Sequence, residues 1–383
     1  MTRVLLSCGE ASGDLYAGAL VRALQTLKPG IEVSGLGGAR FAAAGARLLA
    51  DYRGMSVTGL VEVVRLLPRT WRTYREILAA ADRARPDVFV PVDYPDFNFR
   101  LGQALSRRGI PVVYYISPQL WAWRPGRLKT IARFVDRMLV IFPFEEELYR
   151  RAGVPVEFVG HPLVDLLAPA PPREEFLTQH GLSPQSTTVG LLPGSRPNEV
   201  SRILAPLLDA ARDIAHRRAD VQFIVARAPG LDSELFAPLG ELRQRGLSLA
   251  VVENETDAAL SVSDVVVTAS GTATVQTAFH DRPMVIVYRL SPLTYTLGVR
   301  LVNVTTYGMV NLVAGSRIVP ELIQDACTGD AIARAVLRYL DEPAYVTNVR
   351  KELARVRERL GGAGASERAA RAILQEATSP SRR

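Results

Sequence analysis

The stretch TTVGLLPGSRPNEV, Thr187–Val200, joins a predicted buried strand to a predicted helix through a short loop. Within the loop, Gly194 lets a ligand approach the backbone, and Pro197 suits the first turn of a helix, where its missing amide costs little. The free amides and the helix dipole at such a junction favour an anion, with Arg196 as a charged clamp beside Ser195. The stretch therefore predicts a strand–loop–helix unit of a parallel sheet, with an anion site in its loop.

The same alternation of apolar runs and helical patterns fills most of the chain. Continuous Val, Ile and Leu runs are typical of strands whose two faces are both covered by helices, which predicts parallel sheets. The predicted strands form two series, 3–8, 31–36, 87–92, 111–116, 137–142 and 156–160, then 187–193, 221–226, 247–252, 264–269 and 283–288. Helical patterns near 14–28, 60–84, 98–108 and 144–152 separate the strands of the first series. The fold class is therefore α/β, with two Rossmann-like domains.

A proline-rich segment, 166–186, separates the two series. It predicts a first domain at 1–168, a linker at 169–186 and a second domain at 187–340. Residues 341–383 predict a charged helical tail, which we expect to pack back on the first domain. Ligands of open parallel sheets bind outside the carboxyl ends of the strands, so we expect the two sheets to face each other across a cleft.

The composition indicates a folded chain with an anionic partner. The 383 residues are 48% hydrophobic and 22% charged, with a formal net charge of +7. A basic chain favours a nucleic acid, an acidic membrane surface or a phosphorylated substrate. Only Cys8 and Cys327 are cysteines, and they lie far apart in sequence, which is typical of a reducing compartment. No apolar run reaches the ~18 residues of a spanning helix, so we expect a cytoplasmic protein that touches membrane only from the surface.

Several cofactor and metal motifs are missing from the sequence. The first strand is not followed by G-x-G-x-x-G, and neither G-x-x-x-x-G-K-[ST] nor a His/Cys zinc spacing occurs. We therefore expect no metal and no bound cofactor. A second strand–helix junction, TASGTATVQTA at 268–278, contains Ser270, Gly271 and Thr272. The two junctions together predict a nucleotide-diphosphate site, although turn and cap chemistry explains either one alone.

Two carboxylates follow a predicted strand in the first domain. The stretch PVDYPDFNFRL, 91–101, places Asp93 and Asp96 just past the strand end. Pro95 favours an extended Tyr94, so that both carboxylates can reach a cleft. Either can serve as a general base, which contributes roughly 10²–10⁴-fold to a rate. The alternative is that one of them is structural, with Asp96 capping a helix that begins at Phe97.

The opening loop, SCGEASGDLYAGAL at 7–20, carries acids where a phosphate loop would offer bare amides. These acids favour a polyhydroxyl ligand, because Glu10, Ser12 and Asp14 can hydrogen-bond to sugar hydroxyls while Gly13 lets the backbone come close. Glu10 is also a further candidate for a catalytic carboxylate. The alternative for Asp14 is that it only caps a helix over Leu15–Leu27.

Basic and apolar residues alternate in GLVEVVRLLPRTWRTYREIL, 59–78. At 100° per residue, arginines gather on one side of a helix and apolar residues on the other. The first group is Arg65, Arg69, Arg72 and Arg75, and the second is Leu66, Leu67, Trp71, Tyr74, Ile77 and Leu78. The pattern fits an interfacial membrane helix or a helix packed on a core with a solvated arginine face.

A second mixed cluster, SPQLWAWRPGRLKTI at 117–131, joins Trp121 and Trp123 to three basic residues. Interleaved aromatic and basic residues are one sign of nucleic-acid binding. The cluster is short and isolated in an enzyme-like α/β chain, so we expect both tryptophans to pack against the protein and expect no nucleic acid as partner.

Taken together, these stretches resemble glycosyltransferase family 19, the lipid-A-disaccharide synthases. The resemblance runs from the first strand to about Cys327, and the order of many short blocks makes it specific. The blocks are GEASGD (9–14), DYPDFN (93–98), SPQLWAWR (117–124), FPFEEELY (142–149), GHPLVD (160–165), LPGSRPNEV (192–200), SGTAT (270–274), VNLVAG (310–315) and PELIQ (320–324).

The resemblance implies a GT-B fold and an inverting transfer without a metal. UDP-2,3-diacylglucosamine would donate its sugar to 2,3-diacylglucosamine-1-phosphate (lipid X), giving a β-1,6-linked disaccharide 1-phosphate and UDP at the inner face of the cytoplasmic membrane. The opening loop would then lie on the acceptor side, and the second domain would bind UDP. The implied nucleotide-side residues are Gly194, Ser195, Arg196, Glu199, Ser270, Gly271, Thr272, Gln276, Asn311, Glu321 and Gln324. The family usually has a glutamate at the position of Gln276, so the role of this residue is open.

Two other functions remain open at this stage. One is a different GT-B enzyme that uses a UDP-sugar, such as an N-acetylglucosaminyltransferase or a 2-epimerase. The other is a carrier of lipid or nucleotide that retains the fold without catalysis. The amphipathic segment argues against the first, and the intact Asp93, Asp96 and Arg196 argue against the second. The sequence also leaves open whether the chain forms a homodimer.

Overall fold

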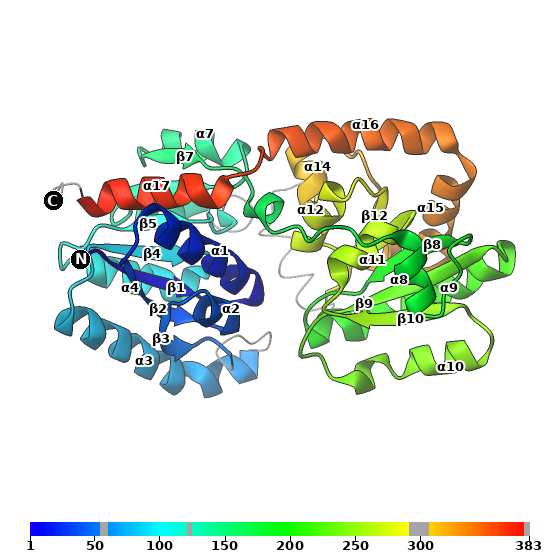
Figure 1. Ribbon diagram of the computed structural model, residues 1–383, viewed down its shortest axis with the longest axis horizontal. Helices are drawn as coiled ribbons and strands as arrows, with labels where there is room; N and C mark the ends of the chain where they lie inside the picture. Colours follow the sequence, from blue (N-terminus) through cyan, green and yellow to red (C-terminus); the bar gives the residue numbers. More distant parts are fainter. Residues whose placement is uncertain (54–59, 121–124, 291–305, 379–383) are drawn as a thin grey trace. The chain divides into compact units, whose positions relative to one another are not determined.

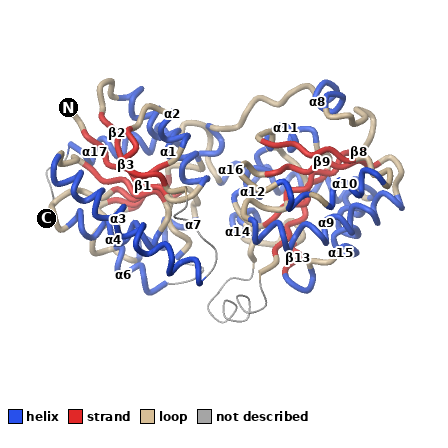
Figure 2. Tube along the Cα trace, turned by 90° about the horizontal axis from the view of Figure 1, so that it is seen from below, coloured by secondary structure: helices blue, strands red, loops and turns tan. Residues whose placement is uncertain are grey.

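The computed structural model describes residues 1–53, 60–120, 125–290 and 306–378, which form two compact units (Figure 1). Unit 1 comprises Met1–Leu166 and Leu360–Arg383, and unit 2 comprises Leu167–Arg359. In each unit, helices cover both faces of a parallel sheet (Figure 2). The expectation of two α/β Rossmann-like domains is confirmed.

The sheet of unit 1 has the strand order β3-β2-β1-β4-β5-β6-β7, and every pair is parallel. The strand order reverses between β1 and β4, and ligands of open parallel sheets commonly bind at the carboxyl ends of the strands beside such a reversal. The strands are β1 (Arg3–Cys8), β2 (Glu32–Gly37), β3 (Arg47–Asp51), β4 (Val88–Val92), β5 (Val113–Tyr115), β6 (Arg137–Val140) and β7 (Val156–Phe158).

The helices of unit 1 connect these strands and bury its apolar core. The core lies where α3 and α4 pack on the sheet, around Ile77, Phe89 and Phe134. The helices are α1 (Ala11–Leu27), α2 (Ala39–Ala43), α3 (Leu60–Arg83), α4 (Pro95–Ser106), α6 (Leu128–Ile131), α7 (Phe144–Arg151) and α17 (Ala365–Thr378), with 3₁₀ turns η1 (Pro125–Arg127) and η2 (Pro162–Asp165).

The last helix, α17, belongs to unit 1 although almost 200 residues separate it from the rest of that unit. It packs beside α1 (Figure 1). Asp165 accepts hydrogen bonds from the backbone N–H of Gly364 (2.6 Å) and Ser366 (2.9 Å), so it caps the start of α17. The Arg368 Nε donates to the Val159 carbonyl at 2.8 Å. The C-terminal part of the chain therefore packs on unit 1 and completes it.

Unit 2 repeats the architecture with the strand order β10-β9-β8-β11-β12-β13 and reverses between β8 and β11. The strands are β8 (Thr187–Leu192), β9 (Val221–Arg227), β10 (Leu249–Glu253), β11 (Val265–Ala269), β12 (Met284–Tyr288) and β13 (Glu321–Ile323). The helices are α8 (Arg173–Gln179), α9 (Pro197–Arg217), α10 (Pro238–Gln244), α11 (Thr256–Val262), α12 (Thr272–Phe279), α14 (Met309–Ala314), α15 (Gly329–Asp341) and α16 (Pro343–Arg359), with 3₁₀ turns η3 (Ser233–Phe236) and η4 (Gln324–Ala326).

Two segments lie in unit 2 that the sequence placed outside the second domain. In the proline-rich segment, Arg173 of α8 donates to the Ser186 carbonyl at 2.9 Å and pairs with Asp264 at 3.0 Å. Helix α16, expected in the tail, also belongs to unit 2. The division of the chain thus falls after Leu166 and again after Arg359, because the return to unit 1 begins only where α16 ends.

Candidate active-site residues

The loops after β1 and β4 start side by side in unit 1, since Cys8 is paired with Val92 in the parallel register. A Cβ atom on Gly9 would lie 2.2 Å from Cγ of Tyr94, so only glycine lets this aromatic ring pack on the first loop. Burial raises the pKa of Tyr94, and the neighbouring carboxylates Glu10 and Asp96 raise it further. The predicted carboxylates of both loops thus surround one tyrosine at the point where the strand order reverses.

Asp93 and Tyr94 have left-handed backbone conformations, with φ of 44° and 51°. The expectation that Tyr94 is extended is wrong: Tyr94 is the N-cap of α4, which starts at Pro95, and it takes the left-handed conformation where N-cap residues are usually extended. Such conformations cost a non-glycine residue of order 1–3 kcal/mol and persist only where the surroundings hold them.

Hydrogen bonds from buried side chains supply that support at Asp93. Its carbonyl oxygen accepts from Asn98 Nδ2 and from the Tyr114 hydroxyl, both at 2.7 Å. Asn98 is fully buried, and its Oδ1 accepts from the Ser7 hydroxyl at 2.6 Å. Strand β1, strand β5 and helix α4 therefore fix the backbone of Asp93. Asn98 lies in the DYPDFN block but was not among the predicted site residues.

Asp96 differs from Asp93 in its surroundings. Its side chain is 81% exposed, and one carboxylate oxygen lies 2.8 Å from Nη2 of Arg127. The hypothesis that Asp96 caps a helix starting at Phe97 is wrong, since the cap position belongs to Tyr94 and carries no side-chain cap hydrogen bond. Arg127 was visible in the sequence only as one of several basic residues near the tryptophans.

On the opening loop, helix α1 starts at Ala11, with the half-buried Glu10 as its N-cap residue. Ser12 is half-buried, and Gly13 is buried. Asp14 is buried as well, and its carboxylate accepts from the backbone N–H of Gly38 (2.7 Å), Arg40 (3.0 Å) and Phe41 (3.1 Å).

The alternative in which Asp14 caps Leu15–Leu27 is therefore wrong, because that helix begins earlier. Asp14 instead caps α2, which follows the neighbouring strand β2. Both carboxylate oxygens are engaged by backbone amides, and this arrangement fixes α2 against α1.

The loop after β8 in unit 2 is shaped by Gly194, whose φ of 121° is accessible only to glycine. Glu199, in the first turn of α9, accepts from the backbone N–H of Ser195 at 3.1 Å and from Nη1 of Arg196 at 3.2 Å. A carboxylate here bonds back to the loop as in a capping box. Arg196 stays 45% exposed, so its guanidinium faces solvent beside the loop amides.

The second predicted junction lies next to the first, because Leu192 of β8 is paired with Thr268 of β11. The Ser270 hydroxyl donates to the Tyr307 carbonyl at 2.9 Å. Gly271 has a φ of 149°, and the exposed Thr272 starts α12. Both junctions thus meet where the strand order of unit 2 reverses, as an anion site formed by two loops requires.

Three further residues that the resemblance placed on the nucleotide side use their polar atoms within unit 2. Asn311 is fully buried and bonds to the Val319 carbonyl (3.0 Å), to the N–H groups of Ile318 and Val319, and to Glu321 (2.8 Å). The Glu321 carboxylate accepts from the N–H of Tyr307 and Gly308, both at 2.9 Å.

Gln324 has a left-handed φ of 54° and bonds to both the N–H and the carbonyl of Leu290. Asn311, Glu321 and Gln324 therefore shape the segments at 288–290 and 306–308, which lie beside the Ser270 loop. This indicates a positioning role for each of them.

Gln276 lies on α12 with its side chain toward α11. Its Nε2 donates to Oδ1 of Asp257 at 2.8 Å, and Nε2 of His280 lies 2.7 Å from the same oxygen. Burial raises the pKa of Asp257, but the hydrogen bonds from His280 and Gln276 outweigh it and the net pKa is lowered. Neither Asp257 nor His280 was among the predicted site residues, because no sequence motif marks them.

Comparison with known proteins assigns the family. A family model described as lipid-A-disaccharide synthetase matches residues 4–375. The chain belongs to this family. A lipid-A-disaccharide synthase of Geobacter sulfurreducens is 45% identical over 376 residues, which cover 97% of each chain. The corresponding protein of Myxococcus xanthus is 42% identical over 373 residues, again with 97% of each chain covered.

Solved structures at much lower identity share the fold of this lipid-A-disaccharide synthase family member. A UDP-GlcNAc 2-epimerase from Neisseria meningitidis, bound to UDP-GlcNAc, is 13% identical with a TM-score of 0.70 over 98% of this chain and all of that one. The calicheamicin glycosyltransferase is 17% identical with a TM-score of 0.62, covering 99% of this chain and 100% of that one. The expected GT-B fold is therefore confirmed, and family membership favours the synthase over an epimerase.

The apolar side chains of α3, which were predicted to share one face, differ in their exposure. Ile77 is buried, and Tyr74 and Leu78 pack partly buried against the core. Leu67 and Trp71 are 54% and 57% exposed. The core-packed interpretation therefore holds for Tyr74, Ile77 and Leu78. Leu67 and Trp71, nearer the start of the helix, form an exposed apolar surface.

Exposed arginines occupy the neighbouring side of the same helix. Arg69, Arg72 and Arg75 are exposed, and Arg72 pairs with Glu76 at 2.8 Å. The side chains of Arg65 and Leu66 lie outside the described residues, as do Trp121 and Trp123. Among the described helices, none is long and apolar enough to cross a membrane.

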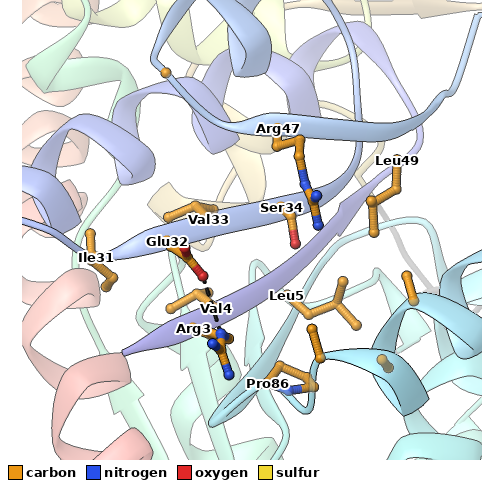
Figure 3. A pocket seen from close by; sticks show the side chains of 14 residues that line it. Arg3, Val4, Leu5, Ile31, Glu32, Val33, Ser34, Arg47, Leu49 and Pro86 are labelled. Atoms are coloured by element: carbon orange, nitrogen blue, oxygen red, sulfur yellow. Dashed lines mark hydrogen bonds and ion pairs between the residues drawn. The ribbon is translucent and has the colours of Figure 1, made fainter. Parts of the chain in front are cut away.

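A hollow of about 430 Å³ in unit 1 lies between the end of α3 and strands β1–β3 (Figure 3). Its lining includes Val4, Leu5 and Leu49, with Arg47 at its side. Arg3 and Glu32, which pair at 3.1 Å, place it at the amino ends of the strands. The hollow is thus remote from the loops at the carboxyl ends and forms no part of the candidate site.

Proposed function

We propose that the chain condenses UDP-2,3-diacylglucosamine with 2,3-diacylglucosamine-1-phosphate to give the β-1,6-linked disaccharide 1-phosphate and UDP. The 6-hydroxyl oxygen of the acceptor attacks C1 of the donor sugar from the face opposite the leaving group. The C1–O bond to UDP breaks, and the hydroxyl proton passes to a carboxylate. The observation that carries this proposal is the pair of junctions at 193–196 and 270–272, which lie side by side where the strand order of unit 2 reverses.

Unit 2 is proposed to bind and stabilise the leaving UDP. Its diphosphate gains negative charge as the glycosidic bond breaks, and the amides of the two junctions together with Arg196 can compensate that charge. A guanidinium carries five N–H donors, so Arg196 can contact Glu199 and a phosphate at once. Glu199 then positions the loop, and Gln276 is proposed to contact the ribose hydroxyls.

Asp93 is proposed as the general base. Catalytic groups work best when their surroundings fix their position, and the backbone of Asp93 is held in a strained conformation by Asn98 and Tyr114. Asp96 is mostly exposed and paired with Arg127, which suits a supporting role. Glu10 and Ser12 are proposed to hydrogen-bond to the acceptor sugar, while Asp14 fixes the helix that carries them.

Disaccharide formation from the two diacylated substrates tests the proposal. We expect Asp93→Asn to lower kcat by roughly 10²–10⁴-fold and Asp96→Asn by much less. Arg196→Ala should lose about 10²–10³-fold, as for other groups that stabilise a developing anion. Equal turnover of UDP-N-acetylglucosamine would favour another UDP-sugar enzyme. UDP binding without any disaccharide would favour a carrier, and wild-type kcat in Asp93→Asn would refute the choice of base.

The reaction is further proposed to need no metal ion. Arg196 and backbone amides supply the positive charge that a metal would otherwise bring to a diphosphate. Among the described residues, no group of three His, Cys, Asp or Glu side chains is arranged to hold a metal. The same assay in EDTA should therefore retain its rate, and restoration by Mg²⁺ of an EDTA-dependent loss would contradict this.

The exposed surface formed by Leu67, Trp71, Arg69, Arg72 and Arg75 is proposed to contact the cytoplasmic face of the inner membrane. Tryptophan and leucine enter the interface, while arginines attract anionic headgroups. Its stacked pair Trp71–Tyr74 (ring centroids 5.2 Å apart) holds the indole toward solvent.

Sedimentation with vesicles containing phosphatidylglycerol tests this contact. Leu67→Ser/Trp71→Ser and Arg72→Glu should each reduce binding, whereas Arg245→Glu, an exposed arginine of unit 2, should not. Equal binding by all four proteins would contradict the proposal. Sedimentation equilibrium of the same protein in the absence of vesicles distinguishes a monomer from a homodimer.

A further inference from the structure

The contact between α11 and α12 joins three polar side chains in unit 2. Oδ1 of Asp257 lies 2.8 Å from Nε2 of Gln276 and 2.7 Å from Nε2 of His280. Asp257 is half-buried in the first turn of α11, and Gln276 is half-buried in the second turn of α12. Both helices begin at the carboxyl ends of their preceding strands, so Asp257 and Gln276 lie within two turns of the edge that carries the two anion junctions, and His280 follows at the far end of α12.

The chemistry of Asp257 determines which way the Gln276 amide faces. An ionised carboxylate only accepts hydrogen bonds, so Gln276 must present its NH₂ group to Asp257. His280 likewise donates its Nε2–H to the same oxygen. The Gln276 carbonyl oxygen then lies on the side away from Asp257, where it can only accept. A hydroxyl group is the kind of ligand that donates to such an oxygen.

We propose that Asp257 is a positioning residue for ribose recognition, which orients Gln276 so that its carbonyl oxygen accepts from a ribose hydroxyl of the nucleotide. This inference rests on the proposed binding of UDP by unit 2. It also explains why an amide suits position 276 in this chain. A carboxylate there would lie about 3 Å from Asp257, and two like charges at that distance disfavour each other.

Nucleotide binding by the full chain tests the proposal, with UDP and 2′,3′-dideoxy-UDP as calorimetric probes. We expect Asp257→Asn to weaken UDP binding about tenfold and to leave dideoxy-UDP binding within twofold of wild type. The reason is that asparagine can offer its own NH₂ group and no longer orients Gln276. Equal loss for both nucleotides would show a merely structural role and overturn the inference.

Two further variants keep the test independent of folding. Gln276→Ala should lose UDP affinity by itself, and adding Asp257→Asn to it should cause no further loss, because Asp257 acts through Gln276. Gln276→Glu should bind UDP poorly, whereas Gln276→Glu/Asp257→Asn should recover affinity, since the repulsion is removed. Additive losses in the first pair, or no recovery in the second, would overturn the inference.

The wild-type protein separates this inference from the proposed function. No binding of UDP at all would contradict the proposed function. Equal binding of UDP and dideoxy-UDP by the wild type would contradict only the ribose contact, and the UDP-dependent reaction would stand.

Discussion

Replacing His161 should change how the stability of unit 1 depends on pH. His161 is 2% exposed, and its ring packs against Tyr16 and Phe142, with centroids 6.0 and 5.4 Å apart. Its Nδ1 accepts from the Leu163 N–H at 3.2 Å. Burial lowers the pKa of His161 from 6.5 to about 3, because the charged ring would lose its hydration.

The sign and size of the effect follow from proton linkage. Between pH 6.5 and 3 the unfolded chain binds a proton at His161 and the folded chain does not, so stability falls as the pH falls through this window. The slope is about 1.4 kcal/mol per pH unit. Acidification from about pH 7.5 to 5 therefore costs about 2 kcal/mol through this residue alone.

The variant His161→Asn keeps an acceptor for Leu163 but cannot be protonated. We expect it to be less stable than wild type at neutral pH, since a ring is lost from the core, yet to lose about 2 kcal/mol less on acidification. Urea unfolding followed by tryptophan fluorescence reports on unit 1, because Trp71, Trp121 and Trp123 all lie in it.

The matched control is His180→Asn in unit 2, which should leave the pH dependence of this signal unchanged. If wild type and His161→Asn lost the same free energy between the two pH values, burial of a neutral imidazole would not be the cause. Because His161 stays neutral in the folded protein at pH 7, the pH profile of kcat should also be the same in wild type and His161→Asn.

Three more substitutions test other parts of the structure. Gly194→Ala should weaken UDP binding at least about tenfold in calorimetry, because the added methyl group would lie 2.7 Å from a Glu199 oxygen and the φ of 121° is unfavourable for alanine. The control Gly240→Ala, where the methyl group would meet open space, should bind UDP normally. Asp165→Ala removes the cap of α17, and hydrogen exchange of that helix should speed up as about 1 kcal/mol is lost; unchanged exchange would contradict the cap. Asn98→Ala should lower kcat more than it raises KM, because the backbone of Asp93 loses its support; a change in KM alone would argue against that role.

The apolar runs of the sequence predict all the central strands and two of the four outermost ones. Strands such as β4 and β11 are buried along their whole length, so their sequences are almost entirely apolar. Of the outermost strands, β7 and β10 were predicted, whereas β3 and β13 were not. Strands β3 and β13 are short, partly exposed and charged at one end or both, so neither sequence carries a long apolar run.

The sequence by itself determined the alternation of strands and helices, the position of the strand–helix junctions at 193–196 and 270–272 and the family, because these depend on local patterns and on short blocks of residues. It could not determine which partner each polar side chain has. Asp14 bonds to amides at 38–41, Asp165 to amides at 364–366, and Asp257 to Gln276. Those contacts exist only because the strand order brings distant loops to one edge of a sheet, and a carboxylate binds whichever donors the packing places beside it. The tertiary structure therefore decided which acids hold the fold together, and it also decided that the backbone of Asp93, the proposed base, is held by Asn98 and Tyr114.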